Sequence, residues 1–188
     1  MNDPATELVH YDHLGPEGAA DAAKALTALY RDVYAEPPYN WGDEHAALFA
    51  KRFEQQRQAP GFDLVVAQAS GELVGFTFGV TLLPDTPWWQ NLTTEVAGEL
   101  TTEYTDRTFA LVELIVAREW RQRGVGKQLH DELLAGRHEE RATLTVLPAA
   151  EPAQHAYVAW GWRRVAQKRN PLPGSPVFDV MVKELLAN

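Results

Sequence analysis

The chain has 188 residues, of which 45% are hydrophobic and 23% are charged, and its formal charge at pH 7 is −9. This length and composition favour one globular domain with a hydrophobic core, and the acidic balance argues against a nucleic-acid-binding protein. The chain has no cysteine, which excludes disulfides, thiolate metal sites and a cysteine nucleophile.

Two helices are predicted near the start of the chain. Apolar residues from Leu26 to Tyr34 recur at the spacing of one helix face, and this helix ends before Pro37, which cannot continue it. A second helix is expected to begin with Asp43 as its N-cap residue and to stop before Pro60.

Two strands at about 62–68 and 73–81 follow, and the short turn between them predicts a β-hairpin. The second strand has bulky residues on one face and small residues on the other. The small face consists of Gly75, Thr77, Gly79 and Thr81. We therefore expect another segment to pack closely against that face.

The regular pattern breaks between residues 83 and 107, where a short acidic helix is predicted over 93–104. A segment of this length without clear structure is more often functional than idle. Its acidic residues Glu95, Glu99 and Glu103 either attract an amine or form a solvated helix face.

Regular structure returns after residue 107. The expected strands are 108–117, 141–147, 162–168 and 177–183, and the expected helices run from the following glycine-rich loop to about His138 and from 150 to 160. This order predicts an α/β fold of the α+β kind, with a central mixed, mostly antiparallel sheet flanked by helices on both faces. We expect a single domain over residues 1–188, with a variable insertion at about 83–107.

The segment from Arg121 to Lys127 places two glycines and three cations at the start of a predicted helix. Glycine lets a ligand approach the backbone closely, and the first amides of a helix favour an anion. A P-loop would need Gly at Arg121 and Ser or Thr at Gln128, and a dinucleotide fingerprint would need a small residue at Leu129. The remaining pattern, Arg-x-x-Gly-x-Gly, predicts a phosphate loop, unless its glycines only turn the chain.

This pattern resembles the phosphate loop of the GNAT superfamily of N-acetyltransferases. The run from Ala156 to Trp162 is similar to the superfamily's Tyr-x-x-x-Gly-aromatic signature, and the order of elements is similar along nearly the whole chain. The resemblance implies acetyl-CoA as the acyl donor, with a strand end binding its pantetheine arm and the loop binding its pyrophosphate. The implied donor-binding residues are Leu114, Ile115, Val116, Arg121, Gln122, Arg123, Gly124, Val125, Gly126 and Lys127.

The chain departs from one branch of the superfamily. Relatives that acetylate protein N-termini often have Asn seven residues before the signature Tyr and Glu on the preceding strand. Here Ala150 and Thr145 stand at those positions, so the usual base and cofactor-contact residues of that branch are absent.

Two residues are candidates for proton transfer. The resemblance places Tyr157 beside the coenzyme A sulfur, where a phenol can protonate the leaving thiolate; the alternative is a packed core tyrosine. Glu113 is the single charge in an apolar strand, and such a carboxylate must be hydrogen-bonded, paired or functional. It is therefore a candidate base, with a purely structural carboxylate as the equal alternative.

The remaining titratable residues give no clear site. The six histidines lack metal-ligand spacing, so no metal is predicted, and His130 and His155 are expected on the surface. Glu139 and Glu140 are expected to be a solvated helix end.

The acceptor site is expected in the variable loops, where aromatic residues suit an apolar or cationic ligand. The candidates are Tyr39, Trp41, Trp88 and Trp89. An equally good interpretation is that these rings cover the core.

The predicted function is therefore acetyl transfer from acetyl-CoA to a primary amine of a small molecule by direct attack on the thioester. Two alternatives stay open: a non-catalytic acyl-CoA-binding or sensor domain, and a protein or peptide N-acetyltransferase. No apolar run reaches the ~18 residues of a membrane span and residues 1–4 do not resemble the start of a signal peptide, so we expect a cytoplasmic protein with no membrane or nucleic-acid partner. Analogy with the family leaves a homodimer open.

Overall fold

The computed structural model describes residues 8–171 and 174–185. The chain divides into two compact units. The first unit comprises Met1–Val80 and Val112–Ala135, and the second comprises Thr81–Leu111 and Gly136–Asn188.

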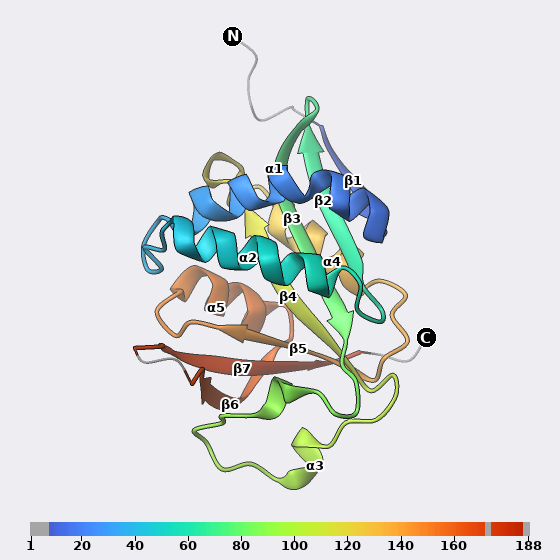
Figure 1. Ribbon diagram of the computed structural model, residues 1–188, viewed down its shortest axis with the longest axis vertical. Coiled ribbons are helices and arrows are strands. Elements are labelled where there is room, and N and C mark those ends of the chain that lie inside the picture. Colours follow the sequence, from blue (N-terminus) through green and yellow to red (C-terminus); the bar gives the residue numbers. More distant parts are fainter. Residues whose placement is uncertain (1–7, 172–173, 186–188) are drawn as a thin grey trace. The chain divides into compact units, whose positions relative to one another are not determined.

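Seven strands form one mixed sheet, which confirms the predicted fold class (Figure 1). The strands are β1 (Val9–Leu14), β2 (Asp63–Ala69), β3 (Glu72–Thr81), β4 (Thr108–Val116), β5 (Arg141–Val146), β6 (Arg163–Arg169) and β7 (Val177–Glu184). They are hydrogen-bonded in the order β1-β2-β3-β4-β5-β7-β6. The β4–β5 pair is parallel, and the β1–β2, β2–β3, β5–β7 and β6–β7 pairs are antiparallel.

Five α-helices accompany the strands in the described residues. They are α1 (Pro16–Tyr34), α2 (Asp43–Gln56), α3 (Gly98–Thr101), α4 (Val125–Leu134) and α5 (Glu151–Ala159), with short 3-10 helices at Pro87–Trp89 and Arg118–Trp120. Among the residues that the structure describes, none of the helices has the length and apolar character needed to cross a membrane.

In the first unit, α1 and α2 lie side by side (Figure 1) and share one aromatic-rich core with the β2–β3 hairpin. Leu26 and Tyr30 of α1 and Phe49 of α2 are buried against Phe76 and Phe78 of β3. These side chains occur at the helical and alternating spacings that the sequence predicts, because each helix buries one face and the side chains of a strand alternate between the two faces of the sheet.

The small face of β3 accepts a close neighbour, as expected. A Cβ placed on Gly75 would lie 2.9 Å from the carbonyl oxygen of Ile115 and 3.0 Å from Cδ1 of Leu129 on α4. Because Phe76 and Phe78 point into the α1–α2 core, the alternation along β3 places α4 against the opposite face of the sheet in this unit. Helices therefore cover both faces here.

In the second unit, the insertion is anchored along the outer edge of β6. Leu92 forms a bridge with Lys168, and the Thr93 amide donates to the carbonyl oxygen of Gln167 at 2.8 Å. The Arg169 amide donates to the carbonyl oxygen of Asn91 at 3.1 Å. The insertion thus satisfies backbone groups that an edge strand would otherwise present to solvent.

The structure corrects two predictions in the first unit. Strand β1 was not predicted, because its alternate residues are largely polar and it has little apolar signal for sequence patterning to detect. The N-cap residue of α2 is Gly42, and Asp43 is already the first helical residue, with no side-chain capping bond. As an acidic residue in the first turn, Asp43 still stabilises the helix through its favourable interaction with the positive end of the helix dipole.

Two predicted helices are also shorter than expected. The helix predicted over 93–104 is limited to Gly98–Thr101, because the chain around Thr93 is extended along β6. The helix after the glycine-rich loop ends at Leu134 instead of about His138, and Gly136 follows with a φ of 67°, a left-handed conformation that terminates helices.

Candidate active site

Glu113 lies in β4 and belongs to the first unit, where its backbone and side chain are both fixed. The Thr77 hydroxyl donates to the carbonyl oxygen of Glu113 at 2.7 Å. The Tyr34 hydroxyl donates to Oε2 of the Glu113 carboxylate, also at 2.7 Å. The predicted need of this carboxylate for a polar partner is thus met by a tyrosine from α1.

The pKa of Glu113 is raised to about 7, chiefly because desolvation disfavours the charged carboxylate. The hydrogen bond from Tyr34 and the positive charge of Arg52 act in the opposite direction. A carboxyl group with this pKa is partly ionised at neutral pH and can exchange a proton there, which an ordinary glutamate does poorly. Its environment is therefore suited to a general base.

Tyr34 has a role that the sequence did not reveal. Burial, and next the negative charge of Glu113, raise the pKa of its phenol well above the ordinary value of 10. The hydroxyl consequently stays protonated and remains a donor. The contact with Glu113 could not be predicted from the sequence, because Tyr34 also fits the apolar face of α1. Nothing in its spacing indicates a partner 79 residues away.

Two of the predicted acceptor residues gather around Tyr34. The Tyr39 ring meets it edge-on at 4.6 Å between centroids, and the Trp41 ring stacks on it at 4.8 Å. Burial and the charge of Glu113 raise the pKa of Tyr39 to about 12. The structure thus brings the candidate base together with Tyr39 and Trp41 in one unit.

The segment from Arg121 to Lys127 forms a tight turn that opens α4. Gln122 and Gly124 have φ values of 60° and 83°, both left-handed, and α4 begins at Val125. The first α4 bond runs from the Gln128 amide to the Gly124 carbonyl oxygen at 3.0 Å. The amides of residues 125–127 precede that bond, as the first amides of a helix do, and they lie at its positive end.

The cations of this loop have partners within the first unit. Arg121 forms an ion pair with Glu36, Lys127 pairs with Asp131, and the Arg123 guanidinium lies 5.0 Å from the centroid of the Trp120 ring. The Arg121 Nε also donates to the carbonyl oxygen of Val116 at 3.2 Å, which ties the loop to the end of β4.

The predicted pantetheine-binding residues occupy that end of β4. The parallel register with β5 covers Thr108–Ala110, and β4 continues beyond it to Val116. Ile115 is buried, whereas Leu114 and Val116 are half-buried. The Ala117 amide donates to the carbonyl oxygen of Val74 at 2.9 Å, so β3 supports the strand end on one side.

Tyr157 lies on α5 in the second unit and is only 7% exposed. Its ring meets Trp160 and Trp162 at 5.7 and 5.9 Å between centroids. The helix is attached one turn earlier, where the side-chain Nε2 of Gln154 donates to Asp179 Oδ2 at 2.9 Å. Tyr157 is therefore held in a fixed aromatic environment.

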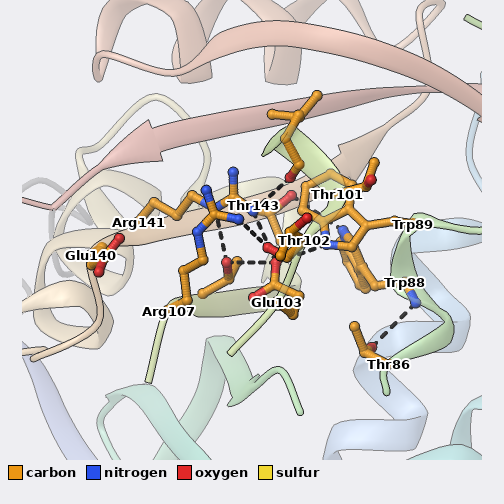
Figure 2. A network of polar contacts seen from close by, with 12 residues as sticks. Thr86, Trp88, Trp89, Thr101, Thr102, Glu103, Arg107, Glu140, Arg141 and Thr143 are labelled. Carbon is orange, nitrogen blue, oxygen red and sulfur yellow. Dashed lines mark hydrogen bonds and ion pairs between the residues drawn. The ribbon is translucent and has the colours of Figure 1, made fainter. Parts of the chain in front are cut away.

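Trp88 and Trp89 lie in the second unit and are less exposed than expected for loop aromatics. Trp89 is buried, and its indole N–H donates to Glu103 Oε1 at 2.8 Å (Figure 2). The half-buried Trp88 indole faces Thr143 Oγ1 at 3.3 Å. Both rings help to hold the insertion, and the prediction that they bind the acceptor stays a prediction.

Three acidic or basic side chains expected at the surface are buried instead. Glu103 accepts from Arg141 at 2.9 Å and Thr108 at 2.8 Å, at the centre of the network in Figure 2. Glu139 accepts from Thr81 and Arg137, each at 2.6 Å. His130 is 2% exposed. Sequence spacing could not detect the burial of these side chains or the contacts of Glu103 with Arg141 and of Glu139 with Thr81. Glu140 and His155 are exposed as predicted.

Solved structures of acetyltransferases resemble this chain in fold. The ribosomal-protein-S18-alanine N-acetyltransferase from Escherichia coli has a TM-score of 0.66 and 16% identity, with 96% of this chain and 97% of that chain covered. The aminoglycoside 6'-acetyltransferase type Ii has a TM-score of 0.65 and 18% identity, with 95% and 99% covered.

A GNAT family acetyltransferase from Elizabethkingia anophelis, solved with acetyl-CoA bound, has a TM-score of 0.52 and 13% identity, with 72% of this chain and 82% of that chain covered. A search of curated proteins finds no match to the sequence. Residues 26–162, well over half of the chain, match the model of the acetyltransferase (GNAT) family. The chain therefore belongs to the GNAT family of acetyltransferases and is an enzyme of that family.

Proposed function

We propose that this enzyme transfers an acetyl group from acetyl-CoA to a primary amine of a small molecule. The observation that carries the proposal is Glu113, a carboxylate with a pKa of about 7 in the same unit as the glycine-rich loop. An amine protonated at neutral pH must lose a proton before it can attack a thioester, and this carboxylate is matched to that task.

The loop is suited to the donor's phosphates. A Cβ placed on Gly124 would meet no atom within 4 Å, so the turn leaves space beside the first amides of α4. Arg121, Arg123 and Lys127 add positive charge to a protein whose formal charge is −9. We propose that residues 121–127 bind the pyrophosphate and that the backbone of Leu114–Val116 binds the pantetheine arm.

The chemistry divides between two side chains. Glu113 takes a proton from the ammonium group, and the neutral amine then attacks the carbonyl carbon of the thioester. This attack forms a tetrahedral intermediate, and a backbone N–H at the end of β4 stabilises its oxyanion. Collapse of the intermediate breaks the C–S bond. Tyr157 gives its phenolic proton to the departing thiolate. The second proton that the nitrogen loses restores the phenol, and Glu113 releases its proton to solvent.

The aromatic residues packed on Tyr34 support an amine acceptor. Tyr39 and Trp41 present half-buried rings, and aromatic faces attract cationic and apolar groups. We propose Trp88 and Trp89 as further acceptor-binding residues. The similar enzymes named above act on an aminoglycoside and on a ribosomal protein, so the fold alone does not choose between acceptors.

We propose one acetyltransferase domain with residues 83–107 as its acceptor-side insertion, acting in the cytoplasm without nucleic-acid or membrane partners. The family match over 26–162 spans this insertion and supports its inclusion in the domain.

The proposal is tested by measuring free thiol release from acetyl-CoA with a panel of small primary amines and, in parallel, short peptides. We expect turnover with at least one small amine. Glu113→Gln should lower kcat/KM by about 10²–10⁴, the usual contribution of a general base, and Tyr157→Phe should lower kcat with retained donor binding. Glu140→Gln, an exposed carboxylate, is the control. Donor binding without transfer to any amine would favour the non-catalytic alternative, and transfer to peptides alone would favour the peptide alternative.

A further inference from the structure

We infer that Tyr34 is a positioning residue that holds the Glu113 carboxylate in its ionised, proton-accepting form. The inference rests on the proposed function, in which Glu113 is the base. It is carried by the 2.7 Å hydrogen bond from the Tyr34 hydroxyl to Glu113 Oε2. The two residues belong to α1 and β4, so the contact joins a helix to the strand that leads into the phosphate loop.

Aromatic rings pack on several sides of the Tyr34 ring and hold its hydroxyl in one orientation. Tyr30 lies 4.4 Å away between centroids, while Tyr39 meets the ring edge-on and Trp41 stacks on it. The Trp41 amide also donates to the carbonyl oxygen of Tyr34 at 2.8 Å. Close aromatic packing of this kind restricts rotation of the side chain.

Glu113 is fixed from the other side. The Thr77 hydroxyl holds the backbone carbonyl of Glu113 at 2.7 Å, which sets where the side chain leaves the strand. Both ends of the Tyr34–Glu113 contact are therefore positioned by contacts within the protein itself. Preorganisation of this kind lowers the cost of reaching the reactive geometry.

The groups that face Glu113 explain why the tyrosine hydroxyl matters. Arg52 of α2 favours the ionised carboxylate by its charge, and Tyr30, Tyr34 and Tyr39 are the phenols whose pKa values respond to Glu113. All three phenols have raised pKa values, so they stay neutral. Among these phenols, the hydrogen bond described to the carboxylate is that of Tyr34, and a donor to a carboxylate favours its ionised form over the neutral acid.

Removing that donor has a defined chemical consequence. Without the Tyr34 hydroxyl, desolvation of Glu113 is opposed less, and the carboxyl group holds its proton to higher pH. A smaller fraction of the enzyme then has a base ready at pH 7. Rate is lost at neutral pH and recovered at alkaline pH.

The test is a ¹³C NMR titration of the Glu113 side-chain carboxyl, assigned by its disappearance in Glu113→Gln. We expect Tyr34→Phe to raise the pKa of Glu113 by about one unit, the scale of a single charge-assisted hydrogen bond. Tyr39→Phe is the matched control for this titration, because it removes a phenol hydroxyl from a ring packed on Tyr34 and should leave the Glu113 pKa within about 0.3 units.

Kinetics supply the second readout. The acid limb of kcat/KM against pH should move upward by the same amount in Tyr34→Phe, with about a fivefold loss at pH 7 and recovery at higher pH. In a Glu113→Gln background, Tyr34→Phe should have no further effect on this limb. A loss of rate equal at every pH, with an unmoved Glu113 pKa, would overturn the inference and indicate packing alone.

The two proposals fail in different ways. If the wild-type protein transfers no acetyl group, the proposed function fails, yet the NMR shift in Tyr34→Phe can still be seen. If transfer occurs and the Glu113 pKa is the same in the wild type and in Tyr34→Phe, the role of Tyr34 is refuted while the function stands.

Discussion

Arg121 of the glycine-rich loop is paired with Glu36, with 2.7 Å between Nη1 and Oε2. Both side chains are about a third exposed, so water screens the pair and the attraction is modest. The cation proposed to bind a phosphate is thus already beside a carboxylate. A phosphate that binds the loop must share or replace this partner.

We expect opposite effects from neutralising the two members of this pair. Arg121→Gln should weaken binding of coenzyme A by about tenfold, since it removes a cation beside the phosphates. Glu36→Gln should tighten binding by about two- to fivefold, since it removes a competing negative charge. Calorimetric titration measures both. Weaker binding in both variants would instead mean that the pair acts by positioning the loop.

Gly75→Ala should destabilise the protein by about 1–3 kcal/mol, because its new Cβ would lie 2.9 Å from a backbone oxygen of β4. Backbone cannot move aside as a flexible side chain can. Urea unfolding followed by circular dichroism measures the change. The matched control is Gly98→Ala, where a Cβ meets nothing within 4 Å, and its stability should stay within about 0.5 kcal/mol of the wild type. Equal stability of the two variants would contradict the close approach of β3 to the end of β4.

Glu103→Ala should destabilise the protein by about 3–5 kcal/mol, because it leaves the buried Arg141 guanidinium without its carboxylate partner. The same change removes the acceptor of the Trp89 indole, so tryptophan fluorescence provides a second signal of the altered insertion. Glu99→Ala, at an exposed position on α3, is the control and should change stability little. A small effect of Glu103→Ala would show that the network is dispensable.

Glu139 gives the protein a defined sensitivity to acid. Burial alone would raise its pKa, but hydrogen bonds from Arg137 and Thr81 outweigh burial and lower the pKa to about 2. Since the ordinary value is 4.5, the unfolded chain takes up this proton first. The stabilising contribution is therefore complete above about pH 4.5 and is lost as the pH falls toward 2.

In Glu139→Gln this titration is absent, so the free energy of unfolding should fall less between about pH 5 and pH 2 than in the wild type. Urea unfolding at several pH values measures the slope. Glu140→Gln, the exposed neighbour, should keep the wild-type slope. A wild-type slope in Glu139→Gln would show that other carboxylates account for the acid sensitivity.

Sequence patterning predicted the elements whose burial is periodic. The apolar face of α1, the alternation in β3 and the glycines before α4 each leave a local signal, because a single backbone geometry determines the spacing. Strand β1 leaves almost none, since it pairs with β2 on one side only and half of its residues face solvent. Its register with β2 is set by contacts fifty to sixty residues away in the sequence.

The same distinction separates the predicted from the unpredicted parts of the site. Glu113 is conspicuous as a charge in an apolar strand, and the loop has a recognisable motif. Tyr34 and Glu103 acquire their roles from partners that the fold brings to them. In the sequence, Tyr34 fits the apolar face of a helix and Glu103 fits the polar face of a solvated helix. A tertiary hydrogen bond has no counterpart in the local sequence.

The measurement that tests the central claim most directly is calorimetric titration of acetyl-CoA into the wild type and into Gly124→Glu, with ATP and NADH as comparison ligands. The account predicts selective micromolar binding of acetyl-CoA that Gly124→Glu abolishes by steric and charge conflict at the turn. Gly136→Glu is the matched control, since this exposed glycine also has a positive φ and open space around it and lies just after the opposite end of α4. Absence of binding in the wild type, or normal binding in Gly124→Glu, would contradict the assignment of the loop as the donor site.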